Sequence, residues 1–182
     1  WDKEGVLDVE LRCFSSGMDA RSALPAKTWV FGGRGAIPAL MCAVRHDTYV
    51  IANCNDEAMV NAVMVRPDSP IMQTKGYNKS YPNVYGTPES VKGKTVLCTT
   101  VSSAHFALSS WLKALGLTEK DVTIKNMDQA PAPAAFEYGI GDIVTLWAPL
   151  TYVGEKRRWK VASPPHACSS APPNVPGAHP EL

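Results

Sequence analysis

Residues 93–147 alternate strand-like and helix-like stretches in the order β-α-β-α-β. Short apolar strands are expected at residues 95–99, 122–125 and 143–147, with a helix in each interval. Strands joined by helical crossovers run parallel, and the loops at their carboxyl ends form a ligand crevice. The segment therefore predicts an α/β fold that contains half of a parallel sheet.

The helix expected after the first of these strands has one continuous apolar face. This face consists of Ala104, Ala107, Leu108, Trp111, Leu112 and Leu115. Ser102 or Ser103 can cap the start of the helix, and Gly116 suits the left-handed position past its end. The next helix is expected to begin at Asp128 as its N-cap and to be weakened by Pro133.

The first ninety residues also alternate strands with helices. Strands are expected at residues 6–14, 29–31, 49–52 and 62–65, and helices at 18–24 and 37–44. Residues 69–92 are polar and turn-rich, so they are expected to connect two units. Residues 163–182 contain six prolines and no apolar period, which predicts an irregular tail.

The composition is that of an ordinary globular protein, and it argues against two classes of partner. Of the 182 residues, 45% are hydrophobic and 19% are charged, enough to bury a real core. A net charge of +1 gives no electrostatic reason to expect nucleic acid or an anionic membrane as a partner. The sequence has no apolar run of transmembrane length, and its first residues are not a signal peptide.

The cysteines do not predict a metal site. Their spacing contains no CxxC pair and no Cys/His cluster of the kind that binds zinc. Each is expected to be a small buried apolar residue rather than a ligand or nucleophile. They are Cys13, Cys42, Cys54, Cys98 and Cys168.

Two strand-to-helix turns, residues 32–36 and 99–104, are candidates for ligand binding. The N–H groups and the positive dipole end of each helix would point into a crevice at the strand ends, where they could hold a small anionic or polar ligand. Arg34 could pair there with a carboxylate or sulfonate, or could be a solvated side chain. Each turn alone is equally consistent with a routine helix cap.

His105 and Trp147 are weaker candidates. His105 lies beside two serines, but the spacing supplies no acid to complete a catalytic triad, so it is expected to lie on the helix face or to contact a ligand. Trp147 follows the third strand and would form either an aromatic wall of the crevice or packing at the strand end.

Motifs spread over residues 1–160 resemble the extracytoplasmic solute-binding proteins of ABC importers. The similarity is to the group for aliphatic sulfonates, taurine, nitrate and thiamine-precursor pyrimidines. Its motifs are, in order, DKEG, LDVEL, FSSG, GGRGAIPAL, NDEAMVNAVMVRPDSPI, VKGKTV, TTVSSAHFAL, LKALGLTEKDVTI, AAFEYGIGDIVTLWAP and EKRRWKVA. Their order and spacing make the match specific to the family, but they leave the substrate open.

The resemblance implies a two-lobed type 2 periplasmic-binding-protein-like α/β fold that closes on its ligand and is incomplete at both ends here. The expected divisions are a partial first lobe (1–68), an inter-lobe connection (69–92), a partial second lobe (93–162) and the tail (163–182). The resemblance also implies ligand contacts and no catalytic residue, cofactor or metal. The implied contacts are Ser16, Gly17, Gly33, Arg34, Gly35, Ser102, Ser103, His105 and Trp147.

A protein of this family would bind a small anionic solute such as an alkyl sulfonate, pass it to a transporter permease, and work in the periplasm. The family's acidic residue between Trp and Pro is Ala148 here. A chain without the family's return segment is expected to bind weakly or to pair with another copy over exposed sheet edges.

Two other functions stay open. An enzyme on the same scaffold, similar to pyrimidine synthases or desulfinases, would need a reactive group built from Cys13, His105 and Arg34. A ligand-sensing lobe of a regulator is the third possibility, although no DNA-binding or kinase segment is visible in the sequence.

Overall fold

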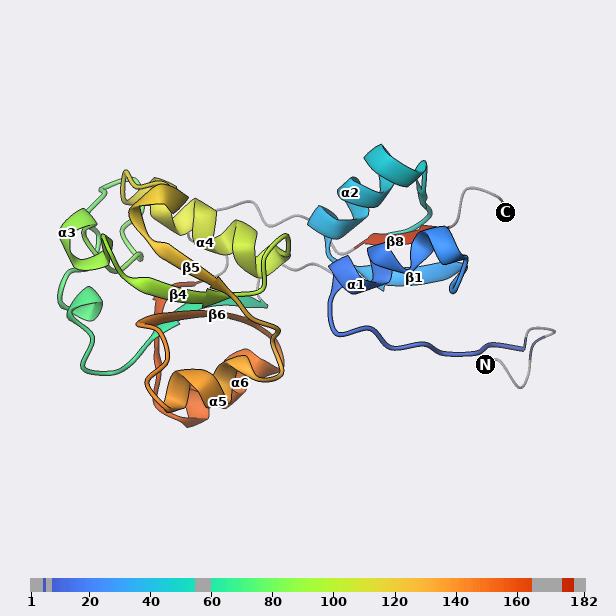
Figure 1. Ribbon diagram of the computed structural model, residues 1–182. Helices are drawn as coiled ribbons and strands as arrows, with labels where there is room; N and C mark the ends of the chain where they lie inside the picture. Colours follow the sequence, from blue (N-terminus) through green and yellow to red (C-terminus); the bar gives the residue numbers. More distant parts are fainter. Residues whose placement is uncertain (1–4, 6–7, 55–59, 165–174, 179–182) are drawn as a thin grey trace.

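The computed structural model describes residues 5, 8–54, 60–164 and 175–178, and it contains two units, each built on its own sheet (Figure 1). The larger unit has a five-stranded sheet with the order β5-β4-β6-β3-β7. The smaller unit has a three-stranded sheet with the order β1-β8-β2. The expected mixed α/β class with two units is therefore present, and neither of the two described sheets contains strands from both units.

In the larger unit, β4 runs parallel to both β5 and β6, as the strand–helix–strand pattern predicts. Strand β3 is antiparallel to β6 and to β7. Figure 1 shows α4 on one face of the sheet and α5 and α6 on the other. The elements are β3 (Asn61–Val65), β4 (Thr95–Cys98), β5 (Thr123–Asn126), β6 (Ile143–Trp147), β7 (Lys160–Ser163), α3 (Pro88–Val91), α4 (Ser103–Ala114), α5 (Ala132–Glu137) and α6 (Leu150–Lys156).

Helix α4 forms as predicted because its apolar stripe packs on the sheet. Leu108, Trp111 and Leu112 are buried against β3, β4 and β6 in one core cluster. Ser102 is the N-cap, and its side chain accepts from the backbone N–H of His105. Gly116 has φ +75° past the helix end, the left-handed conformation that glycine adopts without strain.

Helix α5 begins later than expected, at Ala132 rather than directly after Asp128. Pro131 takes the cap position, so Pro133 falls in the first turn, where its missing N–H removes no helical hydrogen bond. The expected weakening by Pro133 is therefore wrong. On this face of the sheet, the rings of Phe136 and Trp159 pack edge to face with their centroids 4.7 Å apart.

The segment 69–92 is not a connection between the units. Ile71, Val84 and Val91 are buried in the same core as Trp111, so the segment belongs to the larger unit. Strand β3 also belongs there, although residues 62–65 were expected in the first lobe. The first crossing between the units therefore falls between β2 and β3.

The smaller unit pairs two segments that lie far apart in the sequence. Strand β8 is antiparallel to both β1 and β2, with Gly33 opposite Pro176 and Tyr49 opposite Ala178. Helices α1 and α2 pack against each other beside this sheet (Figure 1). The elements are α1 (Gly17–Ser22), the 3-10 turn η1 (Leu24–Ala26), β1 (Phe31–Arg34), α2 (Ala36–His46), β2 (Tyr49–Val50) and β8 (Val175–Ala178).

Three sequence expectations, for the two ends of the chain and for β1, are corrected. Residues 163–182 are not wholly irregular, because Ser163 ends β7 and residues 175–178 form β8; residues 165–174 and 179–182 lie outside the described part. Residues 8–14 alternate in sequence but form no strand, and Leu11 is 87% exposed. Strand β1 begins at Phe31 rather than at Trp29 and includes Gly32 and Gly33, and Trp29 precedes it with its Nε1 donating to the carbonyl oxygen of Ala20.

The cysteines divide into two classes. Cys42 and Cys98 are buried as expected, whereas Cys13 and Cys54 are exposed. Residues 8–14 form no strand, and β2 already ends at Val50. Cys168 lies outside the described residues. Among the helices that the structure describes, none is long and apolar enough to cross a membrane.

Candidate functional site

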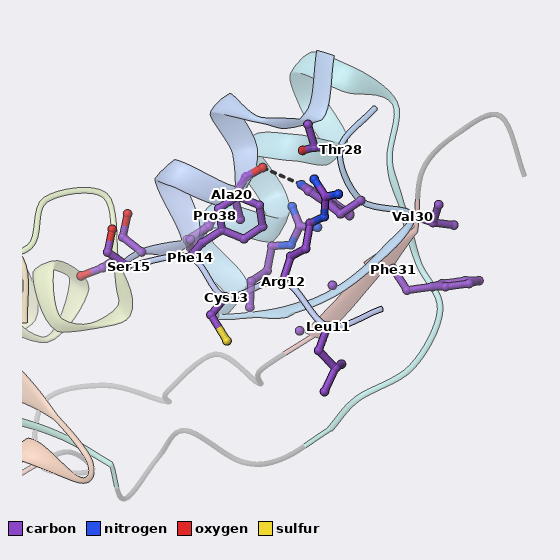
Figure 2. A pocket seen from close by; sticks show the side chains of 18 of the residues that line it. Leu11, Arg12, Cys13, Phe14, Ser15, Ala20, Thr28, Val30, Phe31 and Pro38 are labelled. Atoms are coloured by element: carbon purple, nitrogen blue, oxygen red, sulfur yellow. Dashed lines mark hydrogen bonds between the residues drawn. The ribbon is translucent and has the colours of Figure 1, made fainter. Parts of the chain in front are cut away.

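A cleft of about 1130 Å³ is lined by residues of both units. The smaller unit contributes the extended segment 8–16, the start of α1 and strand β1, and the larger unit contributes the start of α4 and the end of β6. Figure 2 shows the wall of the smaller unit, with Arg12 and Cys13 from the extended segment, Ala20 from α1 and Pro38 from α2. Parts of the chain that lie far apart in the sequence therefore meet at one hollow.

Eight of the nine residues singled out from the sequence line this cleft. They are Ser16, Gly17, Gly33, Arg34, Gly35, Ser102, Ser103 and Trp147. His105 does not line it. Gly17 has a packing reason as well, because a Cβ there would lie 2.6 Å from Cγ of Pro38. The structure thus brings the predicted residues together, and their role in binding stays a prediction.

At the start of α4 the serine side chains are engaged in holding the turn. The Ser102 hydroxyl donates to the carbonyl oxygen of Thr99 at 2.6 Å, and the Ser103 hydroxyl donates to Oδ1 of Asn61 at 3.1 Å. By their position in the first turn, the backbone N–H groups of Ser103 and Ala104 have no intrahelical acceptor. The donors that this helix offers to the cleft are therefore main-chain groups.

Helix α2 presents a second N-terminus at the cleft. Its N-cap is Gly35, which has no side chain to satisfy the first N–H groups. Ala36 and Ile37 follow as the first helical residues, and Pro38 has no N–H. Two helix N-termini, one from each unit, thus lie at the same cleft and favour negative charge there.

Arg34 is the most deeply buried charge in this wall, with only 5% of its surface exposed. Its guanidinium lies 4.2 Å above the centre of the Trp29 ring, and Nη1 donates to Sγ of Cys42 at 2.7 Å. The hydrogen bond from Trp29 to Ala20, the dashed line in Figure 2, fixes the ring under the guanidinium. This wall therefore carries a positive charge that is withdrawn from water.

Gln129 supports the opposite wall and was missed by sequence reasoning. Its Nε2 donates to Oγ1 of Thr99 at 3.0 Å and to the carbonyl oxygen of Thr145 at 3.1 Å, while Oε1 accepts from the N–H of Trp147 at 3.0 Å. This buried side chain ties the ends of β4 and β6 together. A single glutamine in a turn has no spacing that could have indicated this role.

His105 lies behind the turn rather than in the cleft. Its Nδ1 accepts from the N–H of Val101 at 3.1 Å, and its Nε2 is 3.2 Å from Oε1 of Glu119. Cys13 and Arg34 line the cleft, but His105 does not join them, so the three groups needed by the enzyme hypothesis are not assembled. The described residues also contain no group of three His, Cys, Asp or Glu side chains that could hold a metal ion.

Comparison with known proteins identifies relatives of one kind. No family model matches the sequence. A Brachyspira hyodysenteriae protein named as an ABC transporter periplasmic binding protein is 30% identical over 162 residues, which is 89% of this chain and 46% of the relative. The chain is a relative of ABC-transporter periplasmic binding proteins. It spans about half the length of the curated relatives that it matches.

Two further comparisons agree with this relationship. The taurine-binding periplasmic protein of Escherichia coli is 25% identical over 159 residues, covering 85% of this chain and 43% of that protein. The periplasmic aliphatic sulphonate binding protein SsuA of Escherichia coli superposes with a TM-score of 0.71 at 22% identity, covering 91% of this chain and 53% of that one. The fold of this chain is therefore the periplasmic-binding-protein fold, and all three relatives are named for binding rather than for catalysis.

Proposed function

We propose that this chain is the solute-binding component of an ABC importer and holds a small anionic organic solute, such as an alkyl sulfonate, in its cleft. The observation that carries the proposal is the convergence of two helix N-termini, from α2 and α4, on one cleft between two units. Main-chain N–H groups and helix dipoles favour an anion without any covalent chemistry. The relatives named for taurine and aliphatic sulphonate bind solutes of this chemical class.

The eight predicted residues that line the cleft are the proposed contacts, and the two units act as the lobes that close on the solute. His105 is left out of this set because it lies behind the turn. By analogy with the relatives, the protein works outside the cytoplasm and delivers its solute to a transporter permease. The open edges of the three-stranded sheet, at β1 and β2, are where a second copy would pair.

A thermal-shift screen tests the proposal. Alkyl sulfonates, taurine, nitrate, bicarbonate and pyrimidines are added in turn, and a solute that binds only the folded chain raises the melting temperature. We expect a sulfonate to give the largest rise. A screen in which every compound of this set leaves the melting temperature unchanged would overturn the proposed function.

A further inference from the structure

Arg34 lines the cleft, and one edge of its buried guanidinium is unused. Nη1 is engaged with Cys42, but Nε and Nη2 are buried and have no hydrogen-bond acceptor among the described residues. These two N–H groups point the same way from the planar guanidinium, so they form the edge that binds two oxygens side by side. Buried arginine is nearly always paired, and this edge is therefore built for a partner.

Within the described part of the chain, the surroundings of Arg34 do not supply a counter-charge. None of the ion pairs formed within the described part of the chain involves Arg34. Burial raises the pKa of the Cys42 thiol, so the sulfur that accepts from Nη1 is uncharged near neutral pH. The face of Trp29 attracts the cation through its quadrupole but carries no net charge.

Gly32 avoids a close contact with this edge. A Cβ at Gly32 would lie 3.3 Å from Nη2 of Arg34 and 3.6 Å from Cε3 of Trp29. Gly32 lies within β1, paired with β8, so the strand backbone does not itself demand glycine. The missing side chain therefore provides space beside the guanidinium rather than conformational freedom.

We propose that Trp29, Gly32 and Arg34 form an oxyanion seat, which binds the acidic group of the solute through paired hydrogen bonds from Nε and Nη2. This inference rests on the proposed function and deepens it by placing the charged end of the solute on the smaller unit. The body of the solute then faces the start of α4 and Trp147 on the larger unit. A carboxylate, a sulfonate or a phosphonate offers the two oxygens that the seat requires.

Calorimetric titration of the full 182-residue chain tests the seat with ethanesulfonate, propionate and ethylphosphonate, which share a two-carbon body. Arg34→Lys keeps the charge but loses the paired edge, and Gly32→Ala keeps Arg34 but crowds Nη2. Lys79→Gln, which removes one exposed positive charge outside the cleft, is the matched control. We expect the tightest of the three anions to lose affinity about tenfold or more in both seat variants. The control should change by less than about twofold.

The outcomes separate the seat from the proposed function. Binding that is unchanged in both seat variants overturns the seat and leaves the proposed function standing. A wild-type chain that binds none of the three anions overturns the seat, and the proposed function falls with it if the thermal-shift screen also finds no ligand. If Arg34→Lys does not fold, as judged by circular dichroism, Gly32→Ala decides alone, because it leaves the guanidinium in place.

Discussion

His105 stabilises the turn that lines the cleft without touching the cleft itself. Val101, in that turn, has φ +54°, a left-handed conformation that is costly for a β-branched residue. Its N–H donates to Nδ1 of His105, one turn into α4, and this bond offsets part of the strain. The histidine is therefore a support for the backbone that carries Ser102 and Ser103.

Two substitutions distinguish the contribution of Nδ1 of His105 from that of Nε2. Asparagine places an acceptor oxygen near the position of Nδ1, whereas glutamine reaches toward Glu119 as Nε2 does. We expect His105→Gln to lower the free energy of unfolding by about 0.5–1.5 kcal/mol, the value of one hydrogen bond, and His105→Asn by less. Urea denaturation measures both. Equal losses would show that the bond to Val101 contributes nothing.

At the scale of elements, the turn between α5 and β6 shows how a backbone conformation and a packing contact can be separated. Gly139 and Gly141 both have positive φ, +86° and +75°. A Cβ at Gly139 would meet nothing within 4 Å, whereas one at Gly141 would lie 3.0 Å from Cγ of Leu97. Leu97 is fully buried in β4, the strand that leads to the cleft.

The two glycines form a matched pair for mutation. Gly139→Ala should cost about 1–2 kcal/mol from left-handed strain alone. Gly141→Ala carries the same strain and must also displace Leu97, so it should be clearly more destabilising. Chemical denaturation of both variants gives the difference, which measures the contact. If the two losses are the same, Leu97 yields at no cost and the turn matters only through its backbone.

Strand β8 is the element that holds the smaller sheet together, because it pairs with both β1 and β2. A chain that ends after residue 174 would leave two short strands with no partner between them. We expect it to melt at a lower temperature and to self-associate at high concentration, as measured by analytical ultracentrifugation. Unchanged melting and a monomeric truncated chain would mean that this strand adds little to the smaller unit.

For the whole molecule, the reactivity of the cysteine thiols shows which parts of the cleft and of the two units are accessible. Cys13 lines the cleft, and Cys54 is exposed outside it. Burial raises the pKa of the Cys98 thiol to about 11, and it also raises that of Cys42, so neither forms the reactive thiolate near neutral pH. Labelling of the native protein therefore distinguishes the cleft from both interiors.

Iodoacetamide labelling in a Cys168→Ser background tests this arrangement. Cys13 and Cys54 should react, whereas Cys42 and Cys98 should react only after unfolding. A bound anion should slow the labelling of Cys13, because the solute and the closing units cover this side chain. The labelling rate of Cys54 should not change. Labelling of Cys13 much faster than an ordinary thiol near neutral pH would instead support the enzyme hypothesis.

The sequence by itself determined those elements whose apolar residues recur at a regular spacing and pack against one neighbouring layer. The stripe of α4 and the short strands β4, β5 and β6 were predictable, because burial of one face or of a whole strand leaves a local pattern. The meeting of Ser102, Ser103 and Trp147 followed from the same logic, since they come after β4 and β6, which are adjacent parallel strands of one sheet. The residues of the smaller unit join them only through the tertiary arrangement. Their binding role stays a prediction.

The tertiary structure decided which strand edges meet and which buried polar groups find a partner. Strand β3 joins β6, and β8 inserts between β1 and β2, because backbone pairing depends on the edges left free by the rest of the fold. The same holds for Gln129, which bridges two strand ends, and for Arg34, which has an unused guanidinium edge beside Gly32. Such contacts join residues that no regular spacing in the sequence relates, so no local pattern could have indicated them.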